Sequence, residues 1–154
     1  SRKNGVLRAS WLGRLQRLEG GSIAERFPPK WEILCDGAHN VAGASAIGEW
    51  LASEERRPTI LIAACSRNRS LRQLLNELPL DDLIALVIFC GTIDGVALGP
   101  GDDPIDISVP VYREDSVEAA MWRGSQVAKT ADEGRLLVLG SLHLVGSVLR
   151  SDSV

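Results

Sequence analysis

The chain has no apolar run approaching the roughly 20 residues that a membrane-crossing helix needs, and its first ten residues, SRKNGVLRAS, lack the regions of a secretory signal. It has no surplus of positive charge either, because 17 Lys and Arg against 20 Asp and Glu give a formal net charge of -3. Its cationic residues are scattered along the chain. These absences argue against membrane and nucleic-acid partners and predict a cytoplasmic protein.

Cysteines are few, and their spacing excludes two further classes of protein. Cys35, Cys65 and Cys90 are odd in number and no two are at C-x-x-C spacing, so neither a disulfide framework nor a zinc site is indicated. Each lies within or at the end of an apolar run, which predicts buried thiols. A single domain of 154 residues removes roughly 70% of its unfolded surface from water, so its core suffices without such crosslinks.

Several motifs of catalytic and binding sites are missing. The chain contains no G-x-x-x-x-G-K-[ST] phosphate-binding loop and no G-x-S-x-G nucleophile elbow. Its GPGDDP stretch follows no predicted strand and opens no helix, which excludes a dinucleotide fingerprint. The acidic residues Asp102, Asp103 and Asp106 lack the spacing of a calcium loop, so no metal site is predicted.

What the chain does have is an alternation of apolar runs typical of buried strands with segments of helical periodicity. This order predicts an α/β domain with a mainly parallel sheet and right-handed crossovers. The predicted strands cover residues 31–36, 59–65, 84–91, 109–112 and 135–140, and the predicted helices cover 41–54, 70–79, 115–131 and 141–150.

Two helices have clear predicted core faces. In the first, the buried face comprises Ala44, Ile47, Gly48 and Leu51. The helix at 115–131 has Asp115 or Ser116 as its cap, and its inner side comprises Val117, Ala120, Met121, Gly124 and Ala128. Helix 70–79 is predicted to begin at Ser70 and to stop at Pro79.

Three other segments lie outside this alternation. Residues 92–108 are rich in Gly, Pro and Asp and predict a long loop. Residues 1–30 read as a lead-in with an edge strand, linking the domain at 31–150 to something upstream, and residues 151–154 as a tail. The chain is therefore expected to be part of a longer protein.

The stretch CDGAHN, residues 35–40, is the strongest candidate for a site. Asp36, His39 and Asn40 stand where a strand meets a helix N-terminus, which favours an anion, and Asp36 suits a sugar hydroxyl. Asp36 and Asn40 would equally serve as helix caps, with His39 on the surface.

A similar junction occurs at residues 135–145, where Gly140 permits a tight turn and Ser141 heads the last helix. The Ser141 hydroxyl and nearby amides suit a carboxylate, although an N-cap serine explains the pattern as well. Arg67 and Arg69 follow the second strand and suit phosphate or carboxylate, or else are solvated.

Taken in order, W-L-G-R-L-Q at 11–16, I-L-C-D-G-A-H-N at 33–40 and L-V-L-G-S-L-H-L-V-G at 136–145 resemble signatures of one family. They look like the C-terminal domain of folylpolyglutamate synthase and dihydrofolate synthase, in the Mur ligase superfamily. The resemblance implies a Rossmann-like three-layer domain. It also implies an ATP-dependent ligase that joins L-glutamate to folate or dihydropteroate through an acyl phosphate.

By this resemblance, Arg14 and Asp36 would bind ATP, Arg14 at the phosphates and Asp36 at the ribose, unless Asp36 instead orients neighbouring groups. His39 and Ser141 would bind glutamate. Asn40, Arg67 and Arg69 are further candidates for phosphate or anion contacts; no residue is assigned as catalytic. The family's P-loop and its Mg²⁺ ligands belong to an N-terminal domain of the same polypeptide, so this piece alone is expected to be inactive.

The chain also departs from the family pattern. Leu12 stands where the family usually has Pro, Val41 where it often has Pro, and His143 where Tyr is common. The family's Lys-Asp pair is replaced by the stretch 67–70, Arg-Asn-Arg-Ser, which loses an acid. A non-catalytic Rossmann-like module that binds a nucleotide or acidic ligand, and another Mur-type amino-acid ligase, remain the alternatives.

Overall fold

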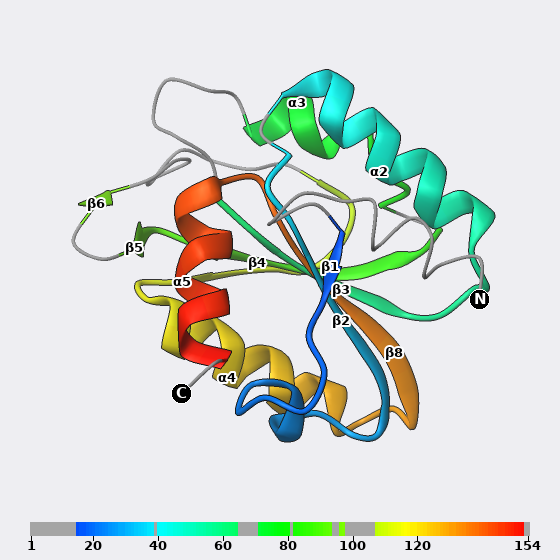
Figure 1. Ribbon diagram of the computed structural model, residues 1–154. Helices are drawn as coiled ribbons and strands as arrows, with labels where there is room; N and C mark the ends of the chain where they lie inside the picture. The colour runs from blue at the N-terminus through cyan, green and yellow to red at the C-terminus, as the bar shows by residue number, and fades with distance from the viewer. Residues whose placement is uncertain are drawn as a thin grey trace.

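The structure is a computed structural model that describes residues 15–38, 40–64, 71–80, 82–93, 96–97 and 107–152. Within these ranges the centre of the molecule is a six-stranded sheet of order β1-β2-β8-β3-β4-β7 (Figure 1). β1 is antiparallel to β2, and the other neighbouring pairs are parallel. The strands are β1 Gln16–Arg17, β2 Lys30–Asp36, β8 Glu133–Leu139, β3 Thr59–Ala63, β4 Ile84–Cys90 and β7 Val111–Glu114.

Helices cover both faces of the sheet. α2, Val41–Ser53, and α3, Leu71–Leu75, pack on one face, while α4, Val117–Ala128, and α5, Leu142–Asp152, pack on the other (Figure 1). The short 3-10 helix η1, Ala24–Arg26, lies on the α4 side. The predicted three-layer α/β architecture with a mainly parallel sheet is therefore confirmed.

The core is split into two layers by the sheet itself. Along β8, Leu136 and Val138 point to the layer under α4 and α5, whereas Leu137 and Leu139 point to the layer under α2 and α3. Successive strand residues face opposite sides, so a strand covered on both faces must be apolar at nearly every position. This explains why the central strands are continuous apolar runs in the sequence.

Both predicted helix faces are confirmed. The buried residues of α2 are Ala44, Ile47, Gly48 and Leu51. α4 begins after Ser116, whose side chain accepts a hydrogen bond from the Ala119 amide at 3.1 Å, and it buries the five predicted residues together with Ser125.

The predicted loop at 92–108 is wrong in part. Thr92–Ile93 and Val96–Ala97 form the antiparallel strands β5 and β6. They are too short to show periodicity, but the Asp-Gly dipeptide between them is a known hairpin signal that could have revealed them. The strand expected at 109–112 lies two residues later, at Val111–Glu114, because Pro110 has no amide to donate to a neighbouring strand.

Other predicted boundaries also shift. α3 ends at Leu75 rather than near Pro79, and turns that bond Glu77 to Leu74 and Leu78 to Leu75 continue it. The predicted cap Ser70 lies outside the described residues. α5 runs on to Asp152, where Asp152 Oδ1 accepts hydrogen bonds from the amides of Ile23, at 2.8 Å, and Ala24, at 3.2 Å. β1 provides the edge strand expected in the lead-in.

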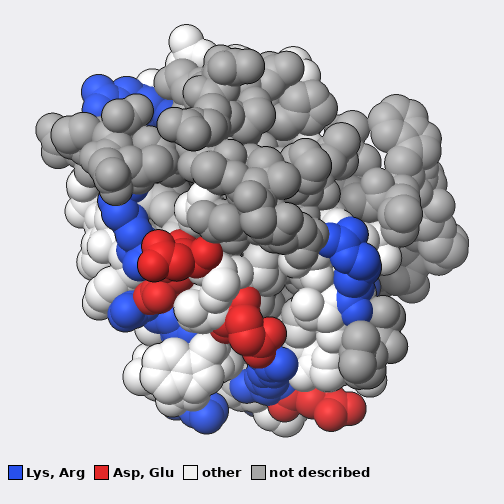
Figure 2. Space-filling view, turned by 90° about the vertical axis from the view of Figure 1, so that its left-hand side faces the viewer, with Lys and Arg blue, Asp and Glu red and all other residues white. Residues whose placement is uncertain are grey.

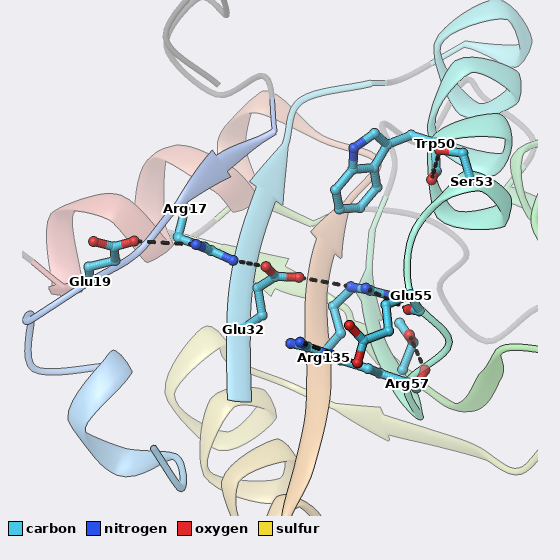
Figure 3. A network of polar contacts seen from close by, with 9 residues as sticks. Arg17, Glu19, Glu32, Trp50, Ser53, Glu55, Arg57 and Arg135 are labelled. Carbon is cyan, nitrogen blue, oxygen red and sulfur yellow. Dashed lines mark hydrogen bonds and ion pairs between the residues drawn. The ribbon is translucent and has the colours of Figure 1, made fainter. Parts of the chain in front are cut away.

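A buried ion network crosses β2 and β8 (Figure 3). Arg135 is 0% exposed; its Nε donates to Glu32 Oε1 at 3.0 Å and its Nη2 to the Glu55 carbonyl at 3.2 Å. Glu32 also pairs with Arg17, and the Arg135 guanidinium lies 5.5 Å from the centre of the Trp50 ring. Burial, followed by the charge of Arg57, lowers the pKa of Arg135 from its ordinary value. The pattern of the sequence did not predict this network.

The described surface mixes charges of both signs. Figure 2 shows acidic and basic side chains lying side by side on one face of the molecule. Within the described ranges, no helix is both long and apolar enough to cross a membrane.

Candidate functional site

The candidate site lies at the carboxyl end of β8, where the chain connections diverge. After β8 the chain passes to α5 on one face, whereas the flanking strands β2 and β3 lead to α2 and α3 on the other face. Such a switch point leaves a crevice outside the sheet edge, and ligands of open α/β sheets bind there. The topology therefore predicts a site at the carboxyl ends of β2, β8 and β3, which form one rim of the sheet.

Three strands end together at this rim. Leu139 is paired with Asp36 of β2 on one side and with Ala63 of β3 on the other. The Ala64 amide continues the pairing by donating to the Leu139 carbonyl at 3.2 Å. The chain therefore leaves the sheet from neighbouring points after Asp36, Ala64 and Leu139.

Asp36 is a buried anchor at this rim. Its side chain is 1% exposed; Oδ2 accepts a hydrogen bond from the Leu15 amide at 3.0 Å and Oδ1 from the Ala38 amide at 2.7 Å. Leu15 directly follows Arg14 in the chain, and Ala38 directly precedes His39. Arg14 and His39 themselves lie outside the described residues, as do Arg67 and Arg69.

Leu15 was missed by the sequence reasoning. Its backbone has φ 46°, in the left-handed region that branched side chains rarely occupy. No local signal marks it, because the carboxylate that holds its amide is 21 residues away in the chain. Its side chain is buried with Leu34 and Ala38 in the layer under α2.

Asn40 is the N-cap of α2. Its Oδ1 accepts a hydrogen bond from the Gly43 amide at 2.8 Å, which confirms the capping alternative for this residue. The predicted contact between Asn40 and an anion stays a prediction.

Ser141 heads α5 from a strained turn. Gly140 has φ 109°, a backbone conformation that other residues rarely adopt. A Cβ at this position would also lie 2.1 Å from the Ala64 carbonyl oxygen. Both the backbone conformation and the packing therefore require glycine here. Ser141 is 5% exposed, and its Oγ accepts a long hydrogen bond of 3.4 Å from the Leu144 amide. This contact agrees with the N-cap interpretation, and a glutamate contact stays a prediction.

The electrostatics of the rim favour anions. α2 and α5 both begin here, from opposite faces of the sheet, and the positive ends of two helices of 13 and 11 residues meet at one edge. The described residues contain no group of three or more His, Cys, Asp or Glu side chains placed to hold a metal ion. It is the two helix N-termini that make the described part of the rim suited to phosphates and carboxylates.

Comparison with known proteins identifies the family of the chain. Residues 21–151 match the family model of the dihydrofolate synthetase C-terminal domain. The chain belongs to that family. A probable dihydrofolate synthetase of Schizosaccharomyces pombe is 25% identical over 156 residues, which cover 96% of this chain and 36% of the relative.

Solved structures share the fold of this family member. The chain resembles the bifunctional folylpolyglutamate synthase/dihydrofolate synthase of Yersinia pestis with a TM-score of 0.69 and 21% identity, over 96% of this chain and 32% of that one. It resembles the folylpolyglutamate synthase of Mycobacterium tuberculosis, complexed with ADP and AMPPCP, with a TM-score of 0.66 and 17% identity, over 92% and 32%. The chain therefore spans about a third of the length of these relatives.

Proposed function

We propose that the chain is the C-terminal domain of an ATP-dependent ligase that adds L-glutamate to folate or to dihydropteroate. The observation that carries the proposal is that β2, β8 and β3 end side by side at one rim, in a member of the dihydrofolate synthetase family. Two related structures support the ligand classes. One is Escherichia coli FolC in complex with DHPP and ADP, and the other is the Yersinia pestis enzyme with Mn, AMPPNP and L-glutamate bound.

The proposed reaction has two steps. A carboxylate oxygen of the acceptor attacks the γ-phosphorus of ATP and ADP departs, which leaves an acyl phosphate. The amine nitrogen of glutamate then attacks the acyl carbon, inorganic phosphate leaves, and the nitrogen loses a proton to give the amide. Such chemistry requires charge stabilisation and positioning, which are what helix N-termini and arginines provide.

Each candidate residue has a role in this scheme. Arg14 neutralises charge on the ATP phosphates, while His39 and Ser141 hold the carboxylates of glutamate. Arg67 and Arg69, which follow β3 in the sequence, provide further anion contacts. Asp36 contributes to binding ATP. The side-chain amide nitrogen of Asn40 donates to a phosphate or another anion, while its oxygen caps α2.

The rest of the machinery is proposed to lie upstream in the same polypeptide. The relatives are about three times as long as this chain, which leaves room for a P-loop domain that closes over ATP. A Mg²⁺ ion would neutralise phosphate charge there. The described residues offer no metal-binding cluster, so no step is assigned to a metal held by this chain.

The test is a ligation assay on the longer protein. With ATP and dihydropteroate or tetrahydrofolate, we expect ADP to form in a glutamate-dependent way and the pterin product to gain one glutamate in mass. The 154-residue chain alone is expected to be inactive. ATP-dependent ligation of an amino acid other than glutamate would support another Mur-type ligase, and the absence of any ligation would support a binding module.

A further inference from the structure

Three arginines gather near the amino ends of β2, β8 and β3, at the opposite end of these strands from the rim. Arg17 and Arg135 both pair with Glu32, whose side chain is 3% exposed. Arg135 and Arg57 meet at Glu55: Arg135 Nη2 donates to its carbonyl at 3.2 Å, and Arg57 Nη2 lies 3.8 Å from its Oε1 (Figure 3). One buried carboxylate therefore serves a cluster with three positive charges.

The other acids nearby compensate this charge only in part. The Glu55 side chain is 69% exposed, and a solvated carboxylate at 3.8 Å contributes little to an ion pair. After burial, the charge of Arg57 is the largest cause that lowers the pKa of Arg135, while Glu54 and Glu55 each act in the opposite direction and less strongly. The two guanidinium groups thus repel each other inside the protein.

Among the residues that the structure describes, two N–H groups of this cluster have no hydrogen-bond partner. They are Nη1 of Arg135, a residue that is 0% exposed, and Nε of Arg57, and both nitrogens are buried. The Trp50 ring, 5.5 Å from the Arg135 guanidinium, attracts its charge but is a poor hydrogen-bond acceptor. Buried charged donors are stable when they meet an acceptor, so the cluster suits an added anion.

A hollow of about 700 Å³ gives access to the cluster from solvent. Arg17, Glu32 and Arg57 all contribute to its lining, and Arg57 also lines a second hollow of about 350 Å³. The other acidic residues of the first hollow are exposed and therefore screened by solvent; they are Glu19, Glu25 and Glu133. The buried arginines thus dominate the electrostatics of its inner part.

We propose that this cluster binds hydrogen phosphate, which accepts hydrogen bonds from Arg57 Nε and Arg135 Nη1 and donates its own O–H to the carboxylate of Glu54. Guanidinium groups match the oxygens of phosphate in charge and geometry. An anion with a proton to donate is favoured because a fully ionised one would be repelled by Glu54. This site does not depend on the reaction that the longer protein catalyses.

Arg56 provides a matched control for Arg57. It is the preceding residue in the chain, but its side chain is 67% exposed and its Nη1 donates to Asp82 Oδ2 at 3.1 Å. Substituting Gln for either arginine removes the same charge. Any effect of net charge on anion binding is therefore equal in the two variants.

The test is urea unfolding of this chain in low millimolar phosphate, with chloride added to keep the ionic strength constant. A ligand that binds only the folded state raises the unfolding midpoint as its concentration rises. We expect equal gains for the wild type and Arg56→Gln, whereas Arg57→Gln should need about tenfold more phosphate for the same gain. An equal gain in Arg57→Gln, or no gain in the wild type, would overturn the proposal.

Sulfate tests the class of anion. It has the shape and charge of phosphate but no proton to donate to Glu54 at neutral pH, so its gain should be severalfold smaller. Both anions stabilise proteins without any site when concentrated, which is why low concentrations are used. Equal gains from sulfate and phosphate would overturn the assignment of a protonated anion.

If Arg57→Gln does not fold, the wild-type chain provides a second measurement. Added phosphate should shift the nuclear magnetic resonance of the Arg57 Nε–H group and leave that of Arg56 unchanged. No shift at Arg57, or the same shift at both arginines, would overturn the proposal.

Discussion

Gly140 is the residue at which the rim is most sensitive to substitution. Its φ of 109° is strained for any side chain, and an added Cβ would lie 2.1 Å from the Ala64 carbonyl oxygen. We expect Gly140→Ala to lower the free energy of unfolding by more than about 3 kcal/mol, because conformational strain and a backbone clash add.

Gly20→Ala is the control for this change in urea unfolding. Gly20 also has a positive φ, 72°, but an added Cβ would meet nothing within 4 Å. Gly20→Ala should lower the free energy of unfolding by about 1 kcal/mol, which is the cost of the backbone conformation alone. Equal losses for the two variants would show that the approach of Ala64 to Gly140 does not matter.

The buried thiol of Cys35 is expected to lower the stability of the fold at alkaline pH. Burial, followed by the charges of Asp152 and Asp36, raises its pKa from 9.0 to about 12. Because the folded pKa is the higher one, the neutral thiol stabilises the fold fully below about pH 9, and this stabilisation is lost as the pH rises towards 12.

The stability of wild-type protein should therefore fall with pH more steeply than that of Cys35→Ala in this range. The expected difference in slope is up to about 1.4 kcal/mol per pH unit, measured by denaturant unfolding at several pH values. Parallel slopes for the two proteins would contradict the assigned burial effect.

The register of β2 against β8 is reinforced by Glu32. This one buried carboxylate bonds Arg135 Nε at 3.0 Å and also pairs with Arg17 (Figure 3). Glu32→Gln would leave the buried Arg135 charge without its counterion, so we expect a loss of about 3–5 kcal/mol in the free energy of unfolding.

Glu19→Gln is the exposed counterpart. Glu19 also pairs with Arg17, at 3.6 Å, but its side chain is 73% exposed. Exposed pairs contribute little, so this change should stay within about 0.5 kcal/mol. If thermal and chemical unfolding give similar losses for both variants, the buried pair does not stabilise the sheet as argued.

Local pattern predicted most strands and helices of this domain, but not their order in space. The faces of α2 and α4 follow from helical spacing, and the central strands from continuous apolar runs. The place of β8 between β2 and β3 depends on pairing across about 75 to 100 residues, which no local pattern encodes. The same holds for the bond between Asp36 and Leu15.

The candidate site, too, could be predicted only in part. The sequence indicated the turns that bear Asp36, Asn40 and Ser141, and the structure brings them to one rim. It could not predict that the Asp36 carboxylate holds backbone amides, because burial and hydrogen-bond partners are properties of the folded molecule. The roles of Arg14 and His39 stay predictions.

For the molecule as a whole, we propose that the strand ends around β8 form one site for ATP and glutamate. The most direct test is the KM of the longer protein for each ligand in Ser141→Ala. Ser116→Ala is the control, because Ser116 is an N-cap too, on the helix after β7, three strands away from β8.

We expect Ser141→Ala, and likewise His39→Ala, to raise the KM for glutamate at least tenfold while the KM for ATP stays within about twofold. Ser116→Ala should lose a similar amount of helix capping, about 1 kcal/mol, and change neither constant. Equal changes in the two constants for Ser141→Ala and His39→Ala would contradict the assignment of this rim to glutamate.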